Sequence, residues 1–235
     1  MDVHKKSKIV GIVQARMGSS RLPNKSMLSL HGSPVVKWLF YRASKAQLLD
    51  ALVFAIPDIE EDDPLSIFLM GLSANVFRGS ELDLIDRFYN AAKEWNADHV
   101  VRVTGDCPFV SGEEIDHLID FYNSGEYDYA YNHIPLKNNY PDGIGAEIMP
   151  FEVLEKLHQE TTEPYDREHV STYIRSHPEI FEIGTFDPKD RRLHFPGIRL
   201  DLDTQQDYEK LSQLNVNMNM NAHEIIAEAR ALGWG

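Results

Sequence analysis

The sequence predicts an α/β fold with a mostly parallel central sheet and helices on both faces. Short apolar runs alternate with stretches of helical length through the first half of the chain, as in proteins built from repeated strand–helix units. The 235 residues fit one domain, and an apolar content of 43% is enough for a sizeable core. Because ligands bind beyond the carboxyl ends of the strands in such sheets, we first expect a site in the loops after the first and fourth strands.

The first half shows the clearest alternation. The apolar run 9–13 is typical of a buried strand, and Pro57 ends the similar run 51–56. Ser33 resembles a helix N-cap with Pro34 at the first helical position. We expect strands at 9–13, 51–56, 75–77 and 99–103, and helices at 34–47, 62–72, 82–95 and 111–123.

The second half is less regular. Residues 132–145 contain two prolines and two glycines and predict a loop. We expect strands at 127–131, 147–149, 180–186 and 197–202, and helices from 150, at 167–176, at 204–214 and at 222–231. No internal repeat or linker interrupts the pattern, so residues 1–235 are predicted to form a single domain.

Charge is distributed unevenly along the chain. The net charge of −14 argues against a basic surface for nucleic acid. Residues 1–49 nevertheless carry nine Lys or Arg and one acid, whereas the remainder carries 14 basic and 36 acidic residues. A basic first segment on an acidic protein suits a polyphosphate ligand, although a merely solvated basic N-terminus is the alternative.

Three features of the sequence indicate the cellular compartment of the protein. Cys107 is the single cysteine, which excludes an intramolecular disulfide and a Cys-rich zinc site. No apolar run approaches the ~20 residues needed to span a bilayer. The basic start passes directly into the first strand without the pattern of a secretory signal. We therefore expect a cytoplasmic protein that does not bind membranes.

The loop 14–25 after the first strand carries three cations and no acid. Glycine and serine let backbone N–H groups approach a ligand closely, and the two guanidinium groups can grip phosphate oxygens bidentately. The loop differs from the P-loop of kinases, because Ser19 and Asn24 stand where that pattern requires glycine before Lys25. It therefore predicts a triphosphate cradle, with a flexible, solvated basic loop as the alternative.

Five segments carry a resemblance to a known family. Residues 14–25, QARMGSSRLPNK, resemble the signature loop of the cytidylyltransferases that include acylneuraminate and ketodeoxyoctonate cytidylyltransferases. The similarity is closest to the branch named after the spore coat polysaccharide protein SpsF, and it recurs in order at 77–92, 101–110, 141–148 and 167–174. The resemblance implies a Rossmann-like, GT-A-type nucleotidyltransferase fold and transfer of CMP from CTP.

The resemblance also implies roles for individual residues. Catalysis is expected from Arg16, Arg21 and Lys25, which would hold the phosphates, together with Asp106. The residues expected to bind the nucleotide are Gln14, Ala15, Arg16, Gly18, Ser19, Arg21, Lys25, Arg78, Ser80, Thr104 and Gly105.

Aspartates near the strand ends predict a magnesium site. Asp106 follows the fourth strand in a tight turn, and strand alternation would place Asp201 and Asp203 on one face. Mg²⁺ is usually bound by one or two protein carboxylates plus water and substrate phosphate. The resemblance favours Asp106 and Asp203 as ligands, although glutamines follow Asp203 where the family usually has proline and glutamate. A turn-stabilising role for Asp106 and a helix N-cap role for Asp203 are the alternatives.

The acceptor end is expected in the later segments that resemble the family. Arg167 could bind an acceptor carboxylate or phosphate, although a surface ion pair is the commoner role for such a residue. Glu81, Asp83 and Arg87 belong to the segment 77–92, and a solvated helix start is an equal alternative for Glu81 and Asp83. Glu168 and His169 follow Arg167 at another expected helix start. The residues expected to bind the acceptor are Asp142, Gly143, Glu147 and Arg167.

Together these expectations describe a Mg²⁺-dependent cytidylyltransferase that activates an acidic sugar or related small metabolite, with release of pyrophosphate. A role in surface polysaccharide biosynthesis and a homodimer follow from the resemblance, with residues 127–200 expected at the acceptor and dimerisation side. Two alternatives remain at this point: a GT-A glycosyltransferase using a nucleotide sugar, and a non-catalytic nucleotide-binding regulator.

Overall fold

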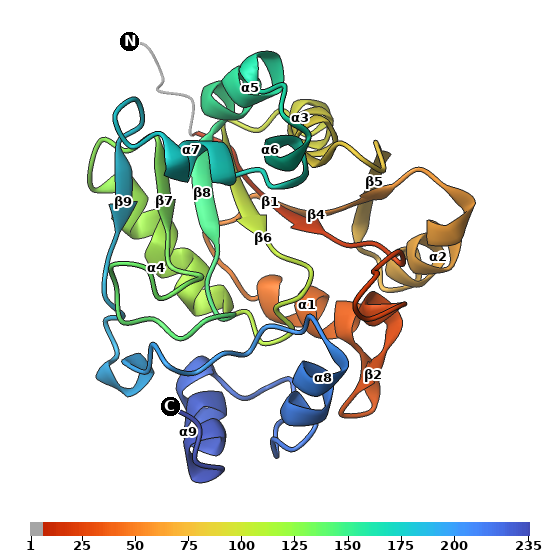
Figure 1. The fold of residues 1–235 in the computed structure, drawn as a ribbon, viewed down its shortest axis with the longest axis vertical. Helices are drawn as coiled ribbons and strands as arrows, with labels where there is room; N and C mark the ends of the chain where they lie inside the picture. The colour runs from red at the N-terminus through yellow and green to blue at the C-terminus, as the bar shows by residue number, and fades with distance from the viewer. Residues whose placement is uncertain (1–6) are drawn as a thin grey trace.

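The computed structural model describes residues 7–235, so the basic stretch expected at residues 1–6 lies outside it. A seven-stranded sheet with the order β5-β4-β1-β6-β8-β7-β9 runs through the molecule (Figure 1). Parallel pairing joins β5, β4, β1 and β6, whereas β8 is antiparallel to both of its neighbours. The predicted mostly parallel α/β sheet is confirmed.

The strands of the main sheet are β1 Ile9–Gln14, β4 Ala51–Pro57, β5 Asn75–Gly79, β6 His99–Val103, β7 Tyr129–Tyr131, β8 Glu147–Pro150 and β9 Ile183–Thr185. The helices are α1 Val35–Ala43, α2 Asp63–Gly71, α3 Leu84–Glu94, α4 Gly112–Asn123, α5 Phe151–Glu160, α6 Pro164–Glu168, α7 Thr172–Ser176, α8 Gln205–Leu211 and α9 Ala222–Ala231. A small hairpin pairs β2 Ser29–Leu30 with β3 Ser33–Pro34. In the described residues, no helix has the length and apolar character needed to cross a membrane.

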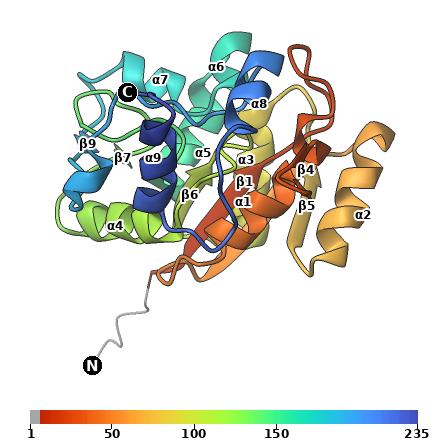
Figure 2. The same cartoon turned by 90° about the horizontal axis from the view of Figure 1, so that it is seen from below.

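Two hydrophobic cores hold the helices against the two faces of the sheet (Figures 1 and 2). Alternate residues of β1 supply both cores, because successive strand side chains point to opposite faces. Val13 packs with residues of α1, α4 and α9, while Val10 and Ile12 pack with residues of α3, α5 and α7. Because helices cover both faces of the sheet, the carboxyl ends of its parallel strands are surrounded by loops.

The last quarter of the chain packs beside the first. In Figure 1, α8 lies next to the hairpin that contains β2. Tyr208 donates a hydrogen bond from its hydroxyl to the Ser29 carbonyl at 2.8 Å, and the His31 ring lies 3.1 Å from the Leu211 carbonyl oxygen. These contacts place the segment before α8 close to the cradle loop.

Three expected elements differ from the structure. Residues 197–202 were expected to form a strand, but they make only an isolated bridge between Arg199 and Asp142. Pro34 lies in β3 and α1 begins one residue later, because the chain first completes the small hairpin. The helix expected at 167–176 is two short helices, α6 and α7, separated at residues 169–171.

Backbone hydrogen bonds replace the missing late strand. The Leu200 N–H donates to the Asp142 carbonyl at 3.0 Å, and the Leu202 N–H donates to the Asp106 carbonyl at 2.7 Å. The second bond ties the residue before Asp203 to the loop after β6. It brings together two carboxylates that are nearly a hundred residues apart in the chain.

Gly105 allows the loop after β6 to approach the end of β1. A Cβ atom at this position would lie 2.0 Å from the Gln14 carbonyl oxygen and 3.4 Å from Cα of Ala15. Both neighbours are backbone, which cannot rotate away. Only glycine fits here without displacing one of the two loops that follow β1 and β6.

We expect Gly105→Ala to lower the free energy of unfolding by about 2 kcal/mol or more, because overpacking against backbone forces the loops apart. Gly71→Ala is the matched control, since a Cβ there meets nothing within 4 Å and alanine is the better helix former. Urea titration of both variants checks this. Equal stabilities for the two variants would contradict the close approach.

Candidate active site

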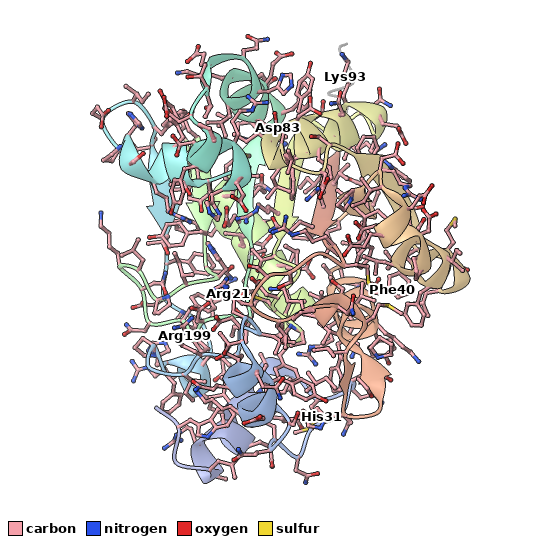
Figure 3. All side chains as sticks on the ribbon, turned by 45° about the vertical axis from the view of Figure 1, so that its right-hand side comes forward. Arg21, His31, Phe40, Asp83, Lys93 and Arg199 are labelled. Carbon is pink, nitrogen blue, oxygen red and sulfur yellow. The ribbon has the colours of Figure 1, made fainter. Side chains whose placement is uncertain are left out.

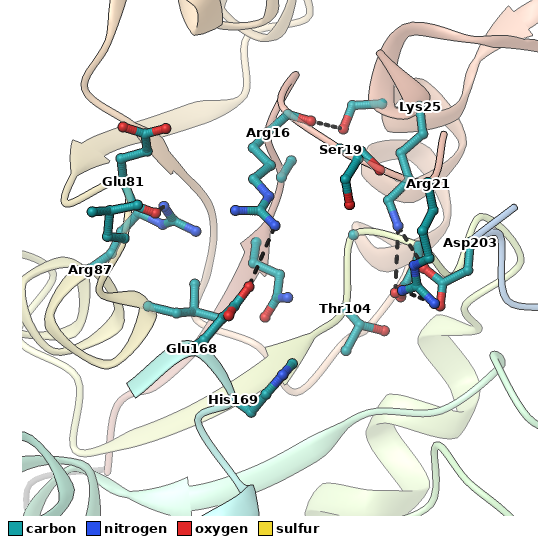
Figure 4. Close-up of a pocket in the computed structure, with 18 of the residues that line it drawn as sticks. Arg16, Ser19, Arg21, Lys25, Glu81, Arg87, Thr104, Glu168, His169 and Asp203 are labelled. Carbon is teal, nitrogen blue, oxygen red and sulfur yellow. Dashed lines mark hydrogen bonds and ion pairs between the residues drawn. The ribbon is translucent and has the colours of Figure 1, made fainter. Parts of the chain in front are cut away.

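A cavity of about 470 Å³ lies at the carboxyl ends of β1 and β6, as expected for a sheet of this type. Polar and charged residues make up most of its wall. Figure 4 shows Arg21, Lys25 and Asp203 gathered at one end, and Arg16, Glu81, Arg87 and Glu168 at the other. The lining residues are Gln14, Ala15, Arg16, Ser19, Ser20, Arg21, Lys25, Ser26, Glu81, Leu82, Leu84, Arg87, Arg102, Thr104, Gly105, Asp106, Glu168, His169 and Asp203.

The cradle loop is held in shape by its own backbone and by buried side chains. The Met17 N–H donates to the carboxylate of the fully buried Asp62 at 2.7 Å. The Ser26 hydroxyl donates to the Arg16 carbonyl at 2.9 Å, and the Asn24 N–H donates to the Met17 carbonyl at 3.2 Å. Asn24 adopts the left-handed conformation with φ 59°. These contacts join the two ends of the loop and hold Met17 to Asp62.

Two carboxylates share one ammonium group at the first end of the cavity. Lys25 Nζ lies 3.0 Å from Asp203 Oδ1 and 3.8 Å from Asp106 Oδ2, and it donates to the Leu202 carbonyl at 3.2 Å. Arg21 adds an ion pair of 2.9 Å to the other oxygen of Asp203. The structure thus joins the predicted cradle cations to both predicted metal-ligating carboxylates.

The alternative of an N-cap role for Asp203 is wrong. Thr204 caps α8 and forms a reciprocal capping box with Asp207. The Asp203 side chain instead points to Lys25 and Arg21 (Figure 4). Asp201 makes a different contact, an ion pair of 2.7 Å with Arg199. Only Asp203 of the two aspartates lines the cavity.

An ion pair crosses the cavity at its other end. Arg16 of the cradle loop lies 3.8 Å from Glu168, the last residue of α6 (Figure 4). Behind it, Arg87 is 3% exposed and donates to the Ser80 carbonyl at 2.7 Å. Burial, and to a smaller extent the neighbouring Arg16, lowers the pKa of Arg87 to about 10, so it stays charged at neutral pH. This end of the cavity therefore combines two guanidinium groups with the carboxylates of Glu81 and Glu168.

Arg102 forms part of the cavity floor. It is a charged residue inside an otherwise apolar strand, 8% exposed. Its Nε donates to Gln14 Oε1 at 2.9 Å, and its Nη1 donates to Glu147 Oε1 at 2.5 Å. Arg102 was not predicted from the sequence as a site residue. A cation within an apolar strand could have indicated it, because buried charges are almost always paired or functional.

Asp106 and Asp203 offer carboxylate oxygens, which are donors that hard divalent cations such as Mg²⁺ prefer. Within residues 7–235, no three His, Cys, Asp or Glu side chains gather as a metal cluster. Two carboxylates beside a phosphate-binding loop match the way Mg²⁺ is held by few protein oxygens, water and substrate phosphate. Zinc and calcium sites require larger protein ligand sets.

Several predicted site residues lie outside the cavity wall. Arg78 is turned toward Asp58 and Asp63, with ion pairs of 3.0 and 2.5 Å. Arg167 pairs with Asp83 at 2.6 Å and so ties α6 to the start of α3. In Figure 3, the labelled Asp83 lies well above Arg21, and Arg199 lies a little below Arg21. The residues in this group are Gly18, Arg78, Ser80, Asp142, Gly143, Glu147 and Arg167, and their binding roles stay predictions.

Cys107 follows Asp106 but is a buried packing residue, as predicted. Its thiol is 4% exposed and lies 2.9 Å from the Thr104 hydroxyl. Burial, reinforced by the negative charge of Asp106, raises the pKa of the Cys107 thiol well above its usual value. The thiol therefore stays protonated and is a poor nucleophile.

Comparisons with known proteins agree with this geometry. A model of the family described as cytidylyltransferase matches residues 10–229. An uncharacterised protein of Methanocaldococcus jannaschii is 37% identical over 93% of this chain and 89% of its own length. The spore coat polysaccharide biosynthesis protein SpsF of Bacillus subtilis is 34% identical over 88% of this chain and 85% of its own length.

Solved structures share the fold. A cytidylyltransferase from Leptospira borgpetersenii has 30% identity and a TM-score of 0.86, covering 97% of this chain and 95% of that chain. A CMP:2-keto-3-deoxy-manno-octonic acid synthetase complexed with CTP has 18% identity and a TM-score of 0.68, covering 88% and 97%. The first comparison extends over nearly the whole of both chains, and the second shows the same fold at lower identity.

Asp142 predicts a pH-dependent stability. Burial, followed by the charge of Asp201, raises the pKa of Asp142 to about 6, against an ordinary value near 4. Its ionised form therefore costs stability, and this cost grows as the pH rises from about 4 through 6. We expect the free energy of unfolding of Asp142→Asn, relative to that of the wild type, to rise by about 1–2 kcal/mol as the pH increases from 4 to 7. Urea unfolding at each pH measures this difference.

Asp190→Asn is the control for that measurement. Hydrogen bonding from Arg192 lowers the pKa of Asp190, so the ionised form stabilises the fold and the pH effect of the substitution has the opposite sign. Parallel pH profiles for the wild type and Asp142→Asn would show that Asp142 ionises normally.

Proposed function

Because this chain belongs to the cytidylyltransferase family, we propose that it transfers CMP from CTP to an acidic sugar or a related small metabolite, with release of pyrophosphate. The observation that supports this most is the shared contact of Lys25 with Asp106 and Asp203 beside the cradle loop. That arrangement places phosphate-binding cations and metal-binding carboxylates in one cavity. The role in surface polysaccharide biosynthesis, the cytoplasmic location and the homodimer expected from the family resemblance are parts of this proposal.

The cradle supplies the groups that a triphosphate needs. Arg21 is an exposed guanidinium able to bind two phosphate oxygens at once, and Lys25 provides a compact charge. Both cations are paired with Asp203. They would hold the β- and γ-phosphates and stabilise the negative charge on the departing pyrophosphate.

Asp106 and Asp203 would hold Mg²⁺. When bound, the ion would neutralise phosphate charge and act as a Lewis acid at the reacting phosphorus. The protein's own contribution is to orient the phosphates and the acceptor in line, because transfers of this kind depend on positioning and electrostatics more than on covalent help. The acceptor oxygen attacks the α-phosphorus of CTP, forming one P–O bond while the bond to pyrophosphate breaks.

Pyrophosphate release tests this function directly. Among the four ribonucleoside triphosphates, we expect CTP with Mg²⁺ and an acidic sugar acceptor to release pyrophosphate in the amount of CMP-sugar formed. A panel containing 3-deoxy-manno-octulosonate, N-acetylneuraminate and phosphorylated sugars is a suitable first set. Release of a nucleoside diphosphate from a nucleotide sugar would support a glycosyltransferase, and binding of CTP without turnover on any acceptor would support a regulator.

The two late aspartates should behave differently. Asp203→Asn removes a carboxylate that contacts both Lys25 and Arg21, so we expect turnover to fall about 100-fold or more. Asp201→Asn is the matched control, since Asp201 pairs with Arg199 and does not line the cavity. Steady-state kinetics at several Mg²⁺ concentrations checks the difference. Equal losses in the two variants would remove the metal-binding role from Asp203.

A further inference from the structure

A buried ionic network lies beneath the cavity, on the face of the sheet that carries α3, α5 and α7. Its centre is Glu147 on β8, whose side chain is 0% exposed. Glu147 Oε1 accepts from Arg102 at 2.5 Å and lies 2.9 Å from His133 Nε2, and Arg175 of α7 approaches the same oxygen at 3.9 Å. Arg102 and Glu147 are direct partners in the β6–β8 register.

Arg102 is the member of this network that reaches the cavity. Glu147 does not line the cavity, whereas Arg102 does, together with Gln14 and Thr104. Gln14 Oε1 and Glu147 fix the Nε and Nη1 positions of the guanidinium group. Among the described residues, no hydrogen bond is made by Nη2, so this nitrogen remains available to a ligand.

Arg102 is separate from the phosphate-binding end of the cavity. Its partners come from β1 and β8, whereas Arg21 and Lys25 are paired with Asp203. Thr104 is two residues further along the same strand line and points to the same side as Arg102, and Arg175 of α7 approaches Glu147, the partner of Arg102, at 3.9 Å. Arg102 therefore belongs to the part of the cavity that faces α6 and the residues after it.

Burying the charged side chains of Arg102 and Glu147 is costly unless they are paired and used. Removing Arg102 or Glu147 from water costs several kcal/mol for each ion, and apolar residues of similar size would be at least as stable there. Burial alone would raise the pKa of Glu147, but Arg102, His133 and Arg175 outweigh it and hold that pKa well below its usual range. Glu147 is therefore a permanent negative charge next to Arg102.

The charges of the network match a single negative charge in the ligand. The two arginines and Glu147 together carry one net positive charge beside the cavity floor. A carboxylate balances that charge. A phosphate group with two negative charges would exceed it and would also be repelled by Glu147.

We infer that Arg102 binds the carboxylate of the acceptor, and that Glu147 positions Arg102 and restricts the bound acid group to one negative charge. This inference rests on the proposed function, because it assigns the acceptor side of the same cavity. It gives Glu147, predicted from sequence to contact the acceptor, an indirect role through Arg102.

Small probes test the inference without knowledge of the natural acceptor. Glycolate carries a hydroxyl and a carboxylate, glycolamide has the same shape without the charge, and hydroxymethylphosphonate carries two negative charges at about pH 8.5. Binding is followed through the backbone amide NMR signals of Val103 and Thr104, which flank the site. We expect glycolate to bind more tightly than either of the other two probes.

Substitutions identify the residue that carries the effect. Arg102→Gln and Arg102→Lys should each lower the affinity for glycolate about tenfold or more, because a hydrogen-bonded charge pair is lost or misplaced. Arg192→Gln is the matched control, an exposed arginine that pairs with Asp190 away from the cavity. Folding of each variant is checked by its amide spectrum. Using two variants keeps the test valid if one of them fails to fold.

Glu147→Gln separates charge from shape. Glutamine can still accept from Arg102, so orientation is kept while the negative charge is removed. We expect hydroxymethylphosphonate to gain at least about tenfold in affinity relative to glycolate in this variant, an effect that a purely structural role would not produce.

Three results would overturn the inference: equal binding of glycolate and glycolamide, wild-type glycolate affinity in both Arg102 variants, or tighter binding of the phosphonate to the wild type. Titration of the same samples with CTP keeps the proposed function separate. A wild-type protein that binds glycolate through Arg102 but does not bind CTP would contradict the proposed function and leave the Arg102 assignment standing.

Discussion

The close parallel pairing of β1 with β6 is the constraint on which the site depends. It places the cradle loop and the loop after β6 side by side at one edge of the sheet. Gly105 lets the two backbones come so close that a Cβ atom at this position would overlap the Gln14 carbonyl oxygen. The Leu202–Asp106 hydrogen bond then attaches the late chain to the same point. These backbone contacts place Arg21 and Lys25 of the cradle loop beside the carboxylate of Asp203.

Much of this arrangement could be predicted from the sequence. Strand–helix alternation predicted the parallel half of the sheet, since β1 and β4 are built on the apolar runs 9–13 and 51–56. The loop at 14–25 and Asp106 were identifiable because they directly follow such strands. Asp203 needed the family resemblance in addition, since nothing local distinguishes it from Asp201.

The remaining features depend on tertiary contacts that no local pattern encodes. Residues 197–202 alternate like a strand, yet their hydrogen bonds go to two loops at Asp142 and Asp106. Arg78 and Arg167 are drawn away from the cavity by Asp58, Asp63 and Asp83, and those pairings could not be inferred from spacing. Arg102 was overlooked because a single cation in a strand has meaning only when its neighbours are known.

The ion pairs around Lys25 balance the charges of Arg21, Lys25, Asp106 and Asp203 at that end of the cavity. A nucleotide carrying its own metal would exchange one set of counter-ions for another: phosphate would replace Asp203 at Arg21 and Lys25, and the cation would take over the released carboxylates. The affinity of such a site depends on the difference in free energy between the ion pairs within the protein and the contacts with the nucleotide and its metal. A phosphate-rich molecule without a divalent ion would leave Asp106 and Asp203 uncompensated. These two carboxylates would therefore discriminate against bare polyphosphate at the cations that attract it, Arg21 and Lys25.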